Sequence, residues 1–200
     1  DYLKELSKRT FLLVEYGVES TCDRSLERIQ RGHSYQTSVK TIERTHAAGI
    51  LVGAHLILGL PGESREEMLQ HADRLSQLPI TTLKIHQLQI IRGTIMAGEY
   101  QRDPSDFHLF TEEEYIDLIV DFVHRLRSDI VLERFVSLGL EEPRVHRQDT
   151  QGAYGYTPRL PKVRALSEEL HLQPLLQAFL TFSYIRYRGA GESPTLITSV

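Results

Sequence analysis

The sequence predicts an α/β protein with a parallel β-sheet, and two observations carry this prediction. Near-continuous apolar runs at residues 11–18, 50–58 and 83–91, with a shorter one at 130–136, are typical of strands in a parallel sheet. Between them lie segments whose apolar residues recur at the spacing of an α-helix. A chain that alternates strand and helix in this order pairs its strands in parallel, with helices covering one or both faces.

The expected helices are marked by their capping residues. A helix at 21–31 follows the first strand, and a second begins at Ser34 and ends before Gly49, a residue type suited to the turn after a helix. Ser64 and Thr111 each stand three residues before a glutamate. This spacing is the pattern of a capping box, so each of the two residues is expected to open a further helix.

The composition is that of a globular protein and gives no evidence for a membrane or nucleic-acid partner. A chain of 200 residues with 40% hydrophobic content is long enough to bury a sizeable core. The net charge of −4 offers no basic surface for nucleic acid, and no apolar stretch approaches the roughly 20 residues of a membrane span. Cys22 is the sole cysteine, which excludes an internal disulfide and fits a cytoplasmic location. We interpret its thiol as structural.

The character of the chain changes near residue 139. Beyond it, proline and glycine fall in a polar stretch, and one helix is expected at 163–182. The sequence therefore predicts a core at 1–139 and a loop-rich, partly helical and partly disordered extension at 140–200.

Carboxylates lie on the first predicted strand, where they share one face. Glu15, Gly17 and Glu19 alternate with apolar residues, and a carboxylate inside a fold is costly unless it is paired or bound to a ligand. For Glu15, one interpretation is an ion pair with Lys84 of the third strand. For Glu19, the alternatives are a ligand contact and a solvated turn residue at a helix start.

Two histidines are placed within apolar strands. His55 and His86 are either hydrogen-bonded core residues or, together with Glu15 or Glu19, ligands of a divalent metal at neighbouring strand ends. The second alternative predicts a metal-dependent barrel hydrolase. The remaining histidines do not show the spacing of known metal motifs, so the sequence supports this alternative only weakly.

Several motifs, taken together and in order, resemble the radical SAM superfamily, in particular its YhcC-like branch, which is close to the Elp3/MiaB/NifB-type domain. The resemblance covers residues 3–137. The motifs lie at 15–20 (EYGVES), 28–35 (RIQRGHSY), 48–50 (AGI), 55–64 (HLILGLPGES), 84–86 (KIH) and 93–94 (GT).

The resemblance implies the C-terminal half of a partial (βα)6 TIM-like barrel. Such a barrel binds S-adenosylmethionine (SAM) beside a [4Fe–4S] cluster, and an external donor such as flavodoxin or ferredoxin supplies the electron. The substrate is not implied by the resemblance.

The resemblance also implies roles for individual residues in binding SAM. Glu19 would contact the ribose, and Arg31 would hold the methionine carboxylate, for which a planar guanidinium is well suited. His55 would reach the ribose from the next strand, and Ile57 would pack against the adenine.

The remaining residues of the predicted site fall into two groups. Ser20 and Gly59 would complete the cofactor-binding site. Glu15, Lys84 and His86 point to the interior of the barrel and are expected on the substrate side of the site, without assigned roles.

The cluster itself is not predicted for this chain. Members of the superfamily hold it with three cysteines in a Cys-x3-Cys-x2-Cys loop, whereas this sequence has Cys22 alone. We expect that the cluster-binding half precedes Asp1 in the complete enzyme. The alternative is a non-catalytic binding module derived from the same fold.

Overall fold

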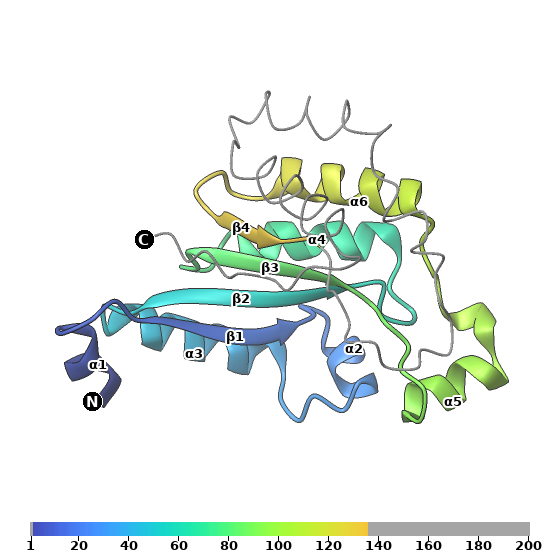
Figure 1. Ribbon diagram of the computed structural model, residues 1–200, viewed down its shortest axis with the longest axis horizontal. Coiled ribbons are helices and arrows are strands. Elements are labelled where there is room, and N and C mark those ends of the chain that lie inside the picture. The colour runs from blue at the N-terminus through green and yellow to red at the C-terminus, as the bar shows by residue number, and fades with distance from the viewer. Residues whose placement is uncertain (1, 136–200) are drawn as a thin grey trace, which may run out of the picture. The chain divides into compact units, whose positions relative to one another are not determined.

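The computed structural model describes residues 2–135, and in this part of the chain four parallel strands form one sheet. Their order in the sheet is their order in the sequence, so each strand pairs with the next one along the chain (Figure 1). The predicted parallel α/β fold is therefore confirmed. The strands are β1 (Leu13–Glu19), β2 (Leu51–Leu58), β3 (Thr82–Gln87) and β4 (Val131–Arg134).

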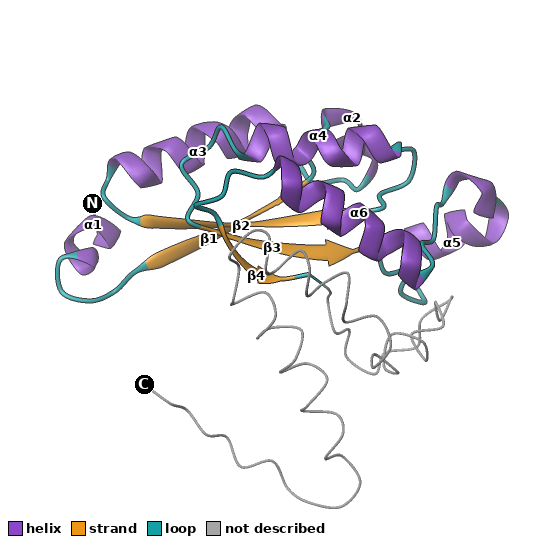
Figure 2. Cartoon of the chain, turned by 90° about the horizontal axis from the view of Figure 1, so that it is seen from above, coloured by secondary structure: helices purple, strands orange, loops and turns teal. Residues whose placement is uncertain are grey.

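The helices that connect these strands lie on one face of the sheet. Figure 2 shows α2, α3, α4 and α6 on the same side of the four strands. The short helix α1 precedes β1, whereas α5 lies beyond the ends to which the strand arrows point (Figure 1). The helices are α1 (Tyr2–Ser7), α2 (Asp23–Arg28), α3 (Tyr35–Ala47), α4 (Arg65–Leu75), α5 (Ile95–Arg102), the 3-10 turn η1 (Pro104–Asp106) and α6 (Glu112–Arg125).

The hydrophobic core lies between this face and the helices. Every second residue of a strand points to the same face, and in β2 the helix-facing set is Val52, Ala54, Leu56 and Leu58, all of them buried. Buried apolar residues of α3, α4 and α6 pack over them, among them Ile42, Met68, Ala72, Leu75, Leu118 and Phe122. The opposite face of the sheet carries the alternate residues, which include the polar residues Glu15, His55 and Lys84.

The predicted starts at Ser34, Ser64 and Thr111 are confirmed, whereas the helix predicted at 21–31 is shorter and begins at Asp23, with Cys22 at its N-cap position. The Ser64 side chain accepts a hydrogen bond from the Glu67 backbone, and the Glu67 side chain accepts one from the Ser64 backbone, which completes the capping box of α4. Thr111 opens α6 with the same reciprocal arrangement. Ser34 caps α3, and Gly49 follows that helix with a φ of 76°.

The prediction of the third strand was wrong at its C-terminal end. β3 stops at Gln87 rather than at 91, and α5 and η1 follow where no helix was expected. The physical reason is a turn at Gly93, whose φ of 87° is left-handed, followed by Thr94 as the cap of α5. The apolar residues that prolonged the run pack instead into a small separate cluster around Ile90, Ala97 and Phe107.

The other strands differ from prediction by only a few residues. β1 begins at Leu13 and extends to Glu19, and β4 is confined to Val131–Arg134. The expected domain boundary at 139, the extension at 140–200 and the helix at 163–182 lie outside the described residues. In the described part, no helix is long and apolar enough to cross a membrane.

Candidate functional site

The candidate site lies on the face of the sheet that the described helices leave free, toward the C-terminal ends of β1 and β2. Parallel pairing places His55 beside Gly17 on one side and beside Lys84 on the other. Ile57 lies two residues further along β2, beside His86, and on the same face as His55. In α/β folds, ligands bind at this end of the strands.

Glu19 and Arg31 converge over Gly17. A β-carbon at Gly17 would lie 2.2 Å from Glu19 Oε1 and 2.7 Å from Arg31 Nη2, so the missing side chain provides the space that both charged groups use. The Arg31 guanidinium also donates to the Gly17 carbonyl from Nε at 3.2 Å and from Nη2 at 2.6 Å. The structure therefore brings together two residues that are 12 positions apart in the sequence.

The backbone at Glu19 is unusual. Its φ is 64°, a left-handed value that is unfavourable for a residue with a β-carbon, and the β1–β2 register shifts between Gly17 and Glu19. Burial raises the pKa of the Glu19 carboxyl, while the charges of Arg31 and His55 oppose this effect. A partly desolvated carboxylate in a strained backbone is a frequent feature of binding sites.

Deeper along the strands, Glu15 and Lys84 form the ion pair that was one of the sequence interpretations. The two residues are two strands apart and meet across Gly53, whose missing side chain leaves room for the Glu15 side chain. Lys84 also lies 3.4 Å from a carboxylate oxygen of Glu133 on β4. The hydrogen bond from Lys84 lowers the pKa of Glu15, although desolvation opposes it, and the same bond raises the pKa of Lys84.

The rings of His55 and His86 lie side by side, nearer the C-terminal ends of the strands than Glu15, with ring centroids 5.6 Å apart. His55 Nε2 lies 3.4 Å from Glu15 Oε2 but without the geometry of a hydrogen bond, so it is a buried polar atom with no hydrogen-bond partner. Burial lowers the pKa of His86, and the nearby charges of His55, Arg134 and Lys84 add to this effect.

Gly59 ends β2 and shapes the turn that follows it. Its φ of 89° favours glycine, and a β-carbon there would lie 2.8 Å from the ring of Phe110. The Gly59 backbone N–H also points to the sulfur of Met68 at 3.2 Å. Gly59 therefore sets the path of the chain at the mouth of the site.

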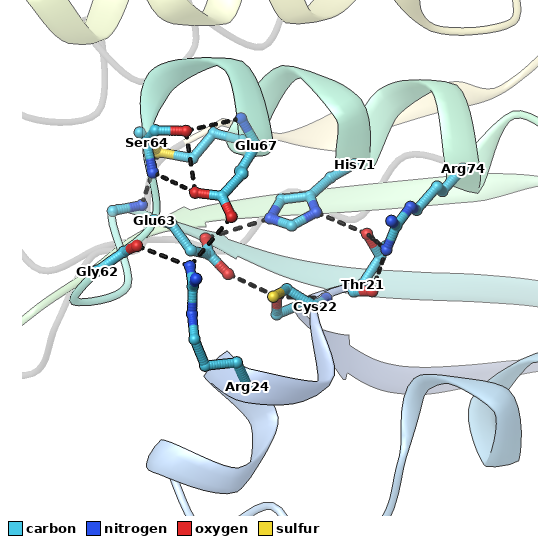
Figure 3. Close-up of polar contacts among 12 residues, drawn as sticks. Thr21, Cys22, Arg24, Gly62, Glu63, Ser64, Glu67, His71 and Arg74 are labelled. Atoms are coloured by element: carbon cyan, nitrogen blue, oxygen red, sulfur yellow. Dashed lines mark hydrogen bonds and ion pairs between the residues drawn. The ribbon is translucent and has the colours of Figure 1, made fainter.

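Ser20, predicted to bind the cofactor, is fully buried and bonds to Glu63. Figure 3 shows the hydrogen-bonded network around Glu63 and His71. The Ser20 hydroxyl donates to Glu63 Oε1 at 2.6 Å, and Glu63 Oε2 lies 3.2 Å from His71 Nε2. The other His71 nitrogen lies 2.7 Å from the hydroxyl of Thr21. Burial alone would raise the pKa of Glu63, but hydrogen bonds from His71 and Ser20 outweigh it and hold the pKa below its usual value of 4.5.

Sequence reasoning missed Glu63 and His71 as parts of the site region. The signal for Glu63 was present, because it closes the Gly-Leu-Pro-Gly-Glu turn after β2. His71 gave no signal, since a histidine between apolar residues of a helix has no distinguishing spacing.

The ligands of a metal or an iron–sulfur cluster are not assembled in this part of the chain. Within residues 2–135, no group of three His, Cys, Asp or Glu side chains could hold a metal ion. Glu15, one of the two glutamates that the hydrolase alternative could use, is engaged by Lys84. A [4Fe–4S] cluster requires several thiolates, and the whole sequence contains only Cys22.

Comparison with known protein families agrees with the resemblance seen in the sequence. The model of the Radical SAM superfamily matches residues 1–75, and the model of the Radical SAM C-terminal domain matches residues 80–153. Among curated proteins, YtqA of Bacillus subtilis is 31% identical over 139 residues, which are 70% of this chain and 42% of YtqA. YhcC of Escherichia coli K12 is 36% identical over 88 residues, which are 44% of this chain and 28% of YhcC.

A solved structure shows the same architecture. Elp3 of Methanocaldococcus infernus superposes with a TM-score of 0.58 at 25% identity, covering 66% of this chain and 31% of the Elp3 chain. The chain thus spans at most about two fifths of the length of these relatives. Its four parallel strands match a partial TIM-like barrel. The chain belongs to the radical SAM superfamily, among relatives that include YhcC, YtqA and Elp3.

Proposed function

We propose that this chain provides the SAM-binding part of a radical SAM enzyme. The observation that carries the proposal is the convergence of the Glu19 carboxylate and the Arg31 guanidinium over Gly17, at the C-terminal end of β1. A carboxylate and a guanidinium side by side complement the two polar ends of SAM, which are a ribose diol and an amino-acid carboxylate. Glu19 would accept hydrogen bonds from the ribose, and Arg31 would donate to the carboxylate.

The residues around this pair support the same assignment. Arg31 uses Nε and Nη2 on the Gly17 carbonyl, and a guanidinium has five N–H donors, so further donors remain for a carboxylate. His55 Nε2 has no hydrogen-bond partner and could meet a ligand hydroxyl. Ile57 offers a β-branched side chain on the same face for an apolar ring. Ser20 and Gly59 support the site by shaping its two loops rather than by a free polar group.

SAM supplies radical chemistry in this superfamily, since its reductive cleavage gives a 5′-deoxyadenosyl radical that abstracts hydrogen from a substrate. The protein contributes binding, orientation and exclusion of water. This chain alone does not provide the thiolates for the cluster, so no step that involves the cluster is assigned to its residues. In the proposed enzyme, a donor such as flavodoxin or ferredoxin would deliver the electron.

The ion pair below the SAM site is proposed to face the substrate. Glu15, Lys84 and His86 lie on the same face of the sheet: Glu15 is four residues before Glu19 on β1, Lys84 is level with His55, and His86 is level with Ile57. Because Lys84 is held between two carboxylates, it is positioned as a donor of fixed direction. The substrate itself is not specified by these groups.

The proposal is tested by the affinity for SAM of the purified protein, measured by calorimetry under anaerobic conditions. Arg31→Lys should weaken binding by about 1–3 kcal/mol, because it removes charge-assisted hydrogen bonds that a lysine cannot make in the same geometry. Arg44→Lys on the exposed side of α3 is the matched control and should leave the affinity unchanged. Equal affinity of the wild type and Arg31→Lys would contradict the proposal.

A further inference from the structure

The loop that follows Glu19 is held from the other side by a buried polar network. Ser20 and Thr21 are 0% and 2% exposed, and both bond to residues of the β2–α4 region. Glu63 lies in the turn after β2, and His71 lies on α4. Figure 3 shows Thr21, Glu63 and His71 pointing toward one another, with Arg74 at the end of the network.

Glu63 stands at the centre of this network. Both carboxylate oxygens of Glu63 are engaged, one by the Ser20 hydroxyl and the other by His71 Nε2. A carboxylate oxygen accepts hydrogen bonds, so the ring N–H that faces Glu63 Oε2 is that of His71 Nε2, and His71 Nδ1 meets the Thr21 hydroxyl. The Ser20 hydroxyl in turn accepts from the Cys22 backbone N–H at 3.0 Å.

Arg74 binds the backbone of the same loop. Its Nη1 donates to the Thr21 carbonyl at 2.5 Å. Thr21 is therefore held through both its side chain and its main chain. Ser20 and Thr21 are therefore held by hydrogen bonds directly after Glu19, whose backbone is strained. Local strain of this kind persists only where the surrounding structure determines the conformation from several directions.

We propose that Glu63 and His71 are positioning residues of the SAM site. By fixing Ser20 and Thr21, they hold Glu19 in its left-handed conformation, with the carboxylate over Gly17 and beside Arg31. They touch neither of these side chains in the described contacts and would act through the backbone alone. The inference rests on the proposed function, because it assigns them to the contact between Glu19 and SAM.

A double-mutant cycle separates this role from a general contribution to stability. Glu63→Ala should weaken SAM binding about tenfold or more, because the loop relaxes and Glu19 leaves its place. Glu19→Ala should weaken binding to a similar extent. In the double variant, the loss should be close to that of Glu19→Ala alone, since Glu63 then has no remaining residue through which to act.

Two further variants sharpen the result. Glu63→Gln should bind SAM within about threefold of the wild type, because an amide of the same shape can accept from Ser20 and donate to His71 after a change of its tautomer. Ile42→Val in the core under α3 is the control for stability and should leave the affinity unchanged. Should Glu63→Ala fail to fold, Thr21→Val removes the contact with His71 at nearly constant volume and should also weaken binding.

The outcomes distinguish the inference from the function on which it rests. Losses that add in the double variant, or a Glu63→Ala protein that binds SAM as the wild type does, would overturn the positioning role while Glu19→Ala still weakens binding. If Glu19→Ala and Arg31→Lys both bind SAM as tightly as the wild type, the proposed function itself fails.

Discussion

Among single residues, Gly17 is the one on which the proposed SAM site depends most. The space above it is shared by the carboxylate of Glu19, at the end of β1, and the guanidinium of Arg31, which follows α2. The resemblance to the radical SAM superfamily implied that Glu19 and Arg31 serve one SAM site, because they match its motif at a spacing of 12 residues. It could not predict the left-handed backbone of Glu19, since nothing in the residue type favours φ above zero.

Gly17→Ala tests this arrangement directly. The new β-carbon meets only the far ends of two flexible side chains, so stability should change by no more than about 1 kcal/mol. Those two ends must move, and SAM affinity should fall by about 1–3 kcal/mol, the range for charge-assisted hydrogen bonds. Gly98→Ala in α5, where a β-carbon meets nothing within 4 Å, is the control and should bind SAM normally. Equal binding by both variants would show that the space at Gly17 has no role.

The ionisation of Glu19 should also change the free energy of unfolding as the pH changes. Burial raises its pKa in the folded protein above the usual 4.5, so the ionised form destabilises the fold once the pH exceeds the folded pKa. This penalty is absent below pH 4.5. Glu19→Gln should therefore increase the free energy of unfolding at pH 7, and the gain should vanish toward pH 4.

Urea denaturation at the two pH values provides the measurement. Glu43→Gln, an exposed position of α3, serves as the control for a change of net charge alone. A Glu19→Gln protein that is less stable than the wild type at pH 7 would mean that attraction by Arg31 outweighs the cost of burial.

At the scale of the elements, the helices were the more predictable part. Ser64 and Thr111 were predicted to open α4 and α6 from their spacing to a glutamate, and both capping boxes are present. α5 was missed because its apolar residues serve a small local cluster instead of a long stripe facing the sheet. The apolar residues before Gly93 then resembled a continuation of β3.

The capping box of α4 is expected to stabilise the folded protein. Ser64→Ala removes the hydroxyl that accepts from the Glu67 backbone, so the free energy of unfolding should fall by about 1 kcal/mol. The loss is measured by urea denaturation. Ser7→Ala, whose hydroxyl lies in the exposed helix α1, is the matched control and should cost clearly less. An equal loss for both variants would argue against a stabilising role of the cap.

At the scale of the whole molecule, the described sheet has two unlike faces. The helices cover one face, whose residues are apolar and buried (Figure 2). The other face carries the charged and polar side chains of Glu15, His55, Lys84 and His86. Alternation along the first strand placed its carboxylates on one face, and the Glu15–Lys84 pair that the structure shows was one of the interpretations of that pattern. The Ser20–Glu63–His71 network could not be predicted, because it joins segments that only the tertiary fold brings together.

A structure of the protein with SAM bound tests the central claim most directly. The account predicts the methionine carboxylate against the Arg31 guanidinium, the ribose hydroxyls against Glu19, and Glu19 still in its left-handed conformation over Gly17. SAM bound elsewhere on the chain, or a saturated complex in which neither Glu19 nor Arg31 contacts the ligand, would contradict it.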